Sequence, residues 1–153
     1  MHTRVATRFL WALREVNLET WLKKYFTRHS ALRKYSRVRI TKIDHPGAGS
    51  HPEARYTSKG IELYPKFWEL PSVVQDFVLT HEFGHHVESE AGLSNLIESA
   101  EALGINPWET STLPFGQHNM EEAFADSFAS YHTDGDVKHR YPLWTALVET
   151  LSR

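Results

Sequence analysis

Apolar side chains recur three or four positions apart over residues 3–26, which predicts one long amphipathic helix or two short ones. A short apolar run at residues 38–43 is typical of a strand, and the proline- and glycine-rich segment 45–54 indicates a loop. Apolar and polar residues alternate towards the end of segment 55–64, so we expect one half-buried strand there, ended by Pro65.

The second half of the chain is predicted to be mainly helical. Apolar spacing, prolines and capping residues predict helices over residues 72–90, 93–103, 120–131 and 143–151. Residues 104–117 contain prolines and glycines and are expected to be irregular, and a turn is expected at residues 134–136. Helices dominate over a small sheet, so the sequence predicts the α+β class.

Length and composition fit one ordinary globular domain of 153 residues. Cysteine is absent, which excludes disulfides and thiolate metal ligands, so any bound metal must be held by His, Asp or Glu. No stretch approaches the roughly 20 apolar residues that cross a bilayer. Arginines interrupt the apolar positions near the start, which argues against a signal peptide. We therefore expect a cytoplasmic protein without a membrane partner, and a bacterial or phage origin stays open.

Charge is unevenly distributed along the chain. Residues 1–44 carry eleven Lys and Arg against three acidic residues, a net charge of +8, and residues 45–153 carry six against sixteen, a net charge of −10. We expect the basic helical segment 1–44 to cover an acidic body. Because such asymmetry also marks segments that bind acidic molecules, an acidic partner for this segment stays open, with nucleic acid less favoured.

Residues 81–85, His-Glu-Phe-Gly-His, form an HExxH motif inside the predicted helix 72–90. Residues four apart share one face of a helix, so His81 and His85 can bind one metal ion together, and Glu82 can reach a water molecule on it. The helix is apolar nearly all round, which indicates burial, and metal ligation would satisfy two buried imidazoles. The alternative is an unmetallated histidine pair in the core.

A catalytic zinc ion usually has three protein ligands, so a third ligand is expected from another element. The candidates are Glu121, Glu122, Asp126, His118 and His132. Glu122 is favoured because it follows the predicted helix cap Asn119 and shares a helical face with Ala125 and Ala129, whose small side chains let a second helix approach.

Asp126 lies four residues after Glu122 on the same helical face. Ligating histidines usually donate their second ring N–H to a carboxylate or a carbonyl, and Asp126 is placed to accept such a bond. Phe124, Phe128 and Tyr131 fall on the far side of this helix, where we expect the core.

The motif together with the later sequence Glu-Glu-Ala-Phe-Ala-Asp resembles the gluzincin type of zincin metallopeptidase, in which a downstream ExxxD helix completes HExxH. It is also similar to ImmA/IrrE-type and lethal-factor-like zincins, over roughly residues 59–131. The resemblance implies a single zincin-like domain over residues 1–153 with its catalytic core at 55–131. It further implies a small, mostly antiparallel sheet whose edge strand, at residues 59–64, receives an extended peptide.

The resemblance implies zinc as cofactor, a peptide or protein as substrate, and hydrolysis by a water molecule that Glu82 activates. The residue that stabilises the oxyanion is open. Lethal-factor-like families have a tyrosine seven residues before the glutamate ligand, and Phe115 stands there in this chain. We rank His118 first, Tyr141 second and His139 third as the donor.

Two alternatives to a general peptidase remain. One is a regulatory zincin that acts on a single specific partner. The other is a nucleic-acid-binding protein in which zinc is structural, and such a site would normally be closed by a fourth ligand, with His118 as the candidate.

Overall fold

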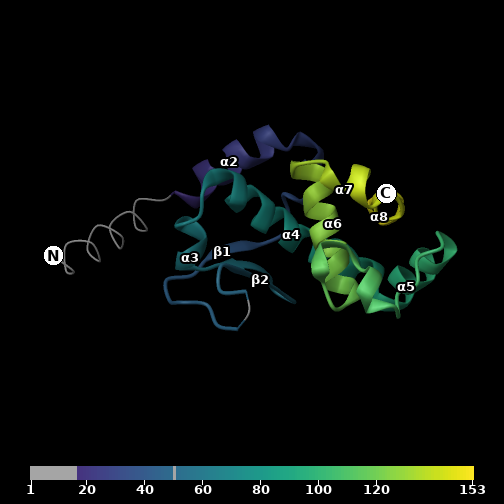
Figure 1. Ribbon diagram of the computed structural model, residues 1–153. Coiled ribbons are helices and arrows are strands. Elements are labelled where there is room, and N and C mark those ends of the chain that lie inside the picture. The colour runs from purple at the N-terminus through teal and green to yellow at the C-terminus, as the bar shows by residue number, and fades with distance from the viewer. Residues whose placement is uncertain (1–16, 50) are drawn as a thin grey trace. The chain divides into compact units, whose positions relative to one another are not determined.

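The computed structural model describes residues 17–49 and 51–153. The chain divides into two compact units, residues 1–71 and 72–153, which carry net charges of +8 and −10. Helices and one small sheet make up the described chain (Figure 1), which confirms the predicted α+β class. No described helix combines the length and apolar character needed to cross a membrane.

The first unit contains short helices around a three-stranded sheet. Its described elements are α2 (Leu18–Arg28), a 3₁₀ helix (Ser30–Tyr35), β1 (Ile40–Lys42), β2 (Ala54–Thr57), β3 (Gly60–Leu63) and α3 (Pro65–Trp68). Asn17 begins α2 by accepting a hydrogen bond from the Thr20 N–H. The part of the predicted first helix at residues 3–16 lies outside the described residues.

The sheet differs from the prediction in two respects. Residues 55–64 do not form one strand, because Ser58 and Lys59 turn the chain between β2 and β3. The Thr57 hydroxyl stabilises this turn by accepting the Lys59 N–H and donating to the Gly60 carbonyl. The sheet is mixed rather than mostly antiparallel, since β3 pairs parallel with β1 and antiparallel with β2.

The strand order β1-β3-β2 places β3 in the centre of the sheet. The expectation that residues 59–64 form an edge strand for an incoming peptide is therefore wrong, because both sides of β3 are already paired. Its burial does alternate as predicted, with Ile61 and Leu63 buried and Glu62 half-buried. In the same unit, the rings of Trp21 and Phe67 meet edge to face with centroids 5.4 Å apart, and Phe67 is fully buried.

The second unit is entirely helical in its regular structure. Its elements are α4 (Ser72–Ala91), α5 (Leu93–Ala102), 3₁₀ turns (Thr110–Thr112 and Pro114–Gly116), α6 (Met120–Thr133), α7 (Asp136–Arg140) and α8 (Pro142–Leu151). The four predicted helices are confirmed within two residues at each end. The predicted turn at 134–136 leads into the short helix α7, which the sequence analysis missed; Gly135, at φ 72°, begins it.

Helices α4 and α6 pack closely on each other (Figure 1). A Cβ atom added to Gly84 would lie 2.8 Å from the Cα of Ala125 and 3.1 Å from the Cβ of Phe128, so only glycine fits there. Ala125 and Ala129 are fully buried at this crossing, as their small size predicts, and Phe124 and Phe128 belong to the core. The crossing brings one face of α6 against the HExxH face of α4.

We expect Gly84→Ala to lower the free energy of unfolding by about 1–3 kcal/mol, because the new methyl group meets backbone rather than a flexible side chain. This loss should appear although alanine is the better helix former by about 1 kcal/mol. Chemical denaturation measures it, with Ser89→Ala on the exposed face of α4 as control. A Gly84→Ala protein as stable as the parent would show that this contact does not set the helix separation.

Candidate metal centre

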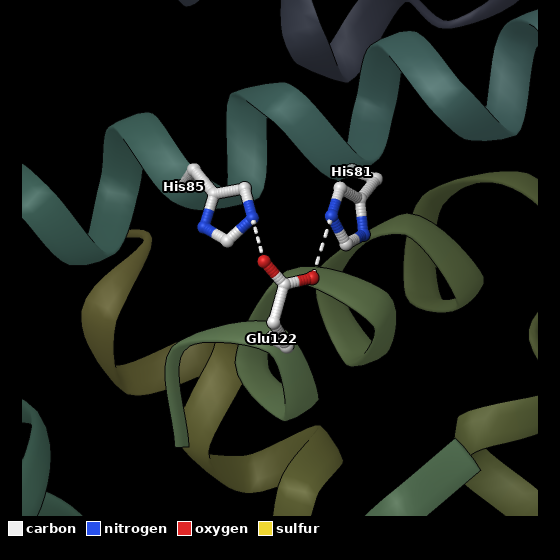
Figure 2. Close-up of side chains that lie close together, drawn as sticks. All are labelled: His81, His85 and Glu122. Atoms are coloured by element: carbon white, nitrogen blue, oxygen red, sulfur yellow. Dashed lines mark ion pairs between the residues drawn. The ribbon is translucent and has the colours of Figure 1, made fainter. Parts of the chain in front are cut away.

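Two adjacent turns of α4 carry His81 and His85, and α6 carries Glu122 opposite them (Figure 2). The Asn119 side chain caps α6 as predicted, accepting the Glu122 N–H at 2.8 Å. This cap places Glu122 in the first turn of α6 with its carboxylate directed at the histidines.

The carboxylate of Glu122 lies between the two imidazoles. Its Oε2 is 3.2 Å from Nε2 of His81, and its Oε1 is 3.0 Å from Nε2 of His85. The two rings are nearly perpendicular, with centroids 4.7 Å apart. One potential ligand atom from each of these three residues lies within 4.8 Å of the others. Both histidines thus present the same ring nitrogen to one point.

The second nitrogen of each imidazole faces another carboxylate. Nδ1 of His81 lies 2.7 Å from Oδ1 of Asp126, and Nδ1 of His85 lies 3.4 Å from Oε1 of Glu88. Since an ionised carboxylate only accepts, both nitrogens of each imidazole donate in the metal-free protein, Nδ1 to Asp126 or Glu88 and Nε2 to Glu122. The bond from Nδ1 to its carboxylate leaves Nε2 as the nitrogen that a metal ion would take. This is the arrangement that orients histidine ligands in metal sites.

The donor set fits a zinc ion. Two imidazole nitrogens and one carboxylate oxygen are a ligand set of catalytic zinc sites. One ligand atom from each of His81, His85 and Glu122 lies within 4.8 Å of the other two, so the three residues could hold one ion together.

In the metal-free protein, the ionisable side chains of the cluster shift one another's pKa values. Burial lowers the pKa of His81, but hydrogen bonds to Asp126 and Glu122 outweigh it and raise that pKa to about 9. Burial also lowers the pKa of His85, but its hydrogen bonds to Glu122 and Glu88 outweigh that effect and raise the pKa to about 10. Hydrogen bonds from both histidines hold the pKa of Glu122 far below its usual value. A metal ion must therefore displace protons from both imidazoles.

Glu82 lies beside this cluster on α4. Only 4% of its surface is exposed, and its charge raises the pKa of both His81 and His85. Glu82 is thus a buried charged neighbour of both imidazoles.

The other candidate ligands are not members of the cluster. In the part of the chain that the structure describes, the group of converging ligand atoms does not include Glu121, His118 or His132. His118 and His139 are exposed. The ring of His132 lies against Phe128 with centroids 4.6 Å apart.

The remaining aromatic candidates also have other neighbours. The Tyr141 hydroxyl accepts a hydrogen bond from the Phe115 N–H at 3.4 Å, and the two rings are 5.3 Å apart. Tyr131, expected in the core, is half-buried instead, and the Lys138 ammonium lies 4.8 Å from the centre of its ring.

Comparisons with protein families, with curated proteins and with solved structures found no significant match. The case for a metal centre is therefore made by the residues of this chain.

Three contributors to the site were not singled out from the sequence. Glu88 could have been found, because it lies three residues after His85 and so shares its helical face. Gly84 was inside the motif, but its role depends on where Ala125 crosses. Gln117, whose amide lies 2.6 Å from Asp126, comes from the irregular segment, where no periodicity predicts direction.

We expect one zinc ion per chain, and we expect His81→Ala, His85→Ala and Glu122→Ala each to abolish its retention, since each removes one converging ligand atom. Elemental analysis after gel filtration measures the content. His86→Ala and Glu121→Ala change neighbouring residues of the same types and should keep the metal. A fully loaded Glu122→Ala protein, or loss of zinc in Glu121→Ala, would contradict the ligand assignment.

Asp126→Asn should weaken zinc binding about 10–100-fold while leaving every ligand in place, because the amide no longer fixes the ring of His81 as a carboxylate does. Competition with a chromophoric chelator measures the dissociation constant. Glu98→Gln on the exposed face of α5 serves as control. An unchanged constant for Asp126→Asn would mean that this hydrogen bond has no part in metal binding.

Proposed function

We propose that this protein is a zinc-dependent hydrolase of the zincin type that cleaves peptide bonds. The observation that carries the proposal is the convergence of His81, His85 and Glu122 from two helices, with the buried Glu82 next to His81 in the sequence. Peptide or protein is the substrate class that the resemblance to gluzincins implies.

The number of converging ligands favours a catalytic site over a structural one. Structural zinc sites are closed by four protein ligands, whereas catalytic sites have three and leave one position for water or substrate. Over residues 17–49 and 51–153 the converging group has three members, and His118, the candidate fourth ligand, is outside it.

Each residue of the site would have its own role. His81, His85 and Glu122 hold the ion, while Asp126 and Glu88 keep the two imidazoles in orientation. When bound, zinc supplies a Lewis acid that polarises the scissile carbonyl and lowers the pKa of water. Glu82 accepts the proton of the attacking water and passes it to the nitrogen of the leaving amine.

Burial of Glu82 supports this role. Because only 4% of its surface is exposed, little water screens its charge from groups held beside it. Glu82 follows the ligand His81 directly in α4, so the helix backbone holds the two residues at a fixed separation.

Glu82→Gln should retain zinc and stability but lose hydrolysis by about 10²–10⁴-fold, since the amide cannot accept the proton. The experiment combines metal analysis with cleavage of a mixed peptide library read by mass spectrometry. Glu90→Gln, at an exposed position of α4, is the matched control. If Glu82→Gln cleaves as fast as the parent, Glu82 is not the base. A zinc-loaded parent that cleaves only one protein would identify the regulatory type of zincin.

A further inference from the structure

A chain of hydrogen bonds extends from the candidate metal centre into the irregular segment before α6. The amide nitrogen of Gln117 donates to Oδ2 of Asp126 at 2.6 Å, and Oδ1 of the same carboxylate accepts from Nδ1 of His81 at 2.7 Å. Both oxygens of Asp126 are thus engaged, each by a different residue.

The backbone before Gln117 takes an uncommon conformation. Phe115 has φ 59° and Gly116 has φ 67°, two successive residues in the left-handed region, and Phe115 is the one non-glycine residue with positive φ in the described part of the chain. Such a conformation is rare for a bulky side chain and persists only where its surroundings support it. The ring and hydroxyl of Tyr141 supply that support.

This turn decides which residue meets Asp126. The chain leaves the 3₁₀ turn Pro114–Gly116 and returns to extended backbone at Gln117, at φ −74° and ψ 155°. Two residues later Asn119 begins α6, so Gln117 is held between a supported turn and a capped helix. Its side chain is therefore attached to a backbone with little freedom.

An amide donor suits this position for a chemical reason. A carboxylate with one bonded oxygen can still rotate about its χ2 angle, whereas a second bond to the other oxygen holds its plane. A lysine or arginine would do the same but would add a positive charge near the metal ion. Gln117 holds Asp126 without adding charge.

We propose that Gln117 is a positioning residue of the metal centre: it fixes the carboxylate of Asp126, which in turn fixes the ring of His81 with Nε2 directed at the ion. The inference rests on the metal-binding part of the proposed function and is independent of which substrate is hydrolysed. In this proposal, the uncommon backbone conformation at Phe115 and Gly116 positions the amide of Gln117 against Asp126.

The test compares three variants of the full chain. Gln117→Met keeps the length of the side chain and removes the donor, Gln117→Lys keeps a donor, and Glu109→Gln alters an exposed residue of the same segment. Each is loaded with zinc to measure affinity by chelator competition, and with cobalt(II) to record the visible absorption spectrum, which reports ligand geometry. Thermal unfolding of the metal-free proteins reports the fold.

Outer partners of ligating histidines are typically worth about 10–100-fold in metal affinity. Gln117 contacts Asp126 and not the ligating histidine itself. We therefore expect about tenfold weaker zinc binding in Gln117→Met, with a changed cobalt spectrum. Gln117→Lys should recover the parent spectrum, although its added charge lowers the affinity, and Glu109→Gln should match the parent in both. A role limited to the fold would lower metal-free stability in Gln117→Met while the cobalt spectrum stayed that of the parent.

Parent affinity and a parent spectrum in Gln117→Met would overturn this inference and leave the metal centre standing. A changed cobalt spectrum that Gln117→Lys does not return to that of the parent would also overturn it, because the donor would then not be the cause. Failure of the parent chain to bind either metal would overturn both this inference and the proposed function.

Discussion

The close crossing of α4 and α6 is the constraint on which the candidate site depends. Gly84 and Ala125 let the two backbones approach at a distance that any larger side chain at Gly84 would prevent. The side chain of Glu122 is only a few bonds long, so its carboxylate contacts both imidazoles only if α6 packs closely on α4. The packing of the second unit and the chemistry of its site therefore rest on the same contact.

Around that contact, polar groups are placed in a consistent order. The imidazoles meet Glu122 through Nε2, and their other nitrogens meet Asp126 and Glu88. Bringing so many ionisable groups out of water is costly unless each has a partner of opposite character. In the metal-free protein the imidazoles and carboxylates pair with each other, and a cation bound between His81, His85 and Glu122 would replace the protons that they share.

The sequence predicted the elements of the site better than their surroundings. Helical spacing within the motif, and the cap at Asn119, identified both helices and the faces that meet, because these features are local. The hairpin at Ser58 and Lys59 was missed, since Thr57 stabilises it through bonds that no hydrophobic pattern reveals. Gln117 was missed for a similar reason: its direction follows from the backbone at Phe115, not from periodicity.

The absence of sulfur from the donor set has a consequence for the conditions in which such a centre can work. Thiolate ligands lose their metal when oxidised to disulfides or sulfenic acids, whereas imidazole and carboxylate groups do not enter that chemistry. With no cysteine anywhere in the chain, peroxide or an oxidising compartment has no thiol through which to release the ion. A zinc ion held by His81, His85 and Glu122 would have no thiolate ligand whose oxidation could release it.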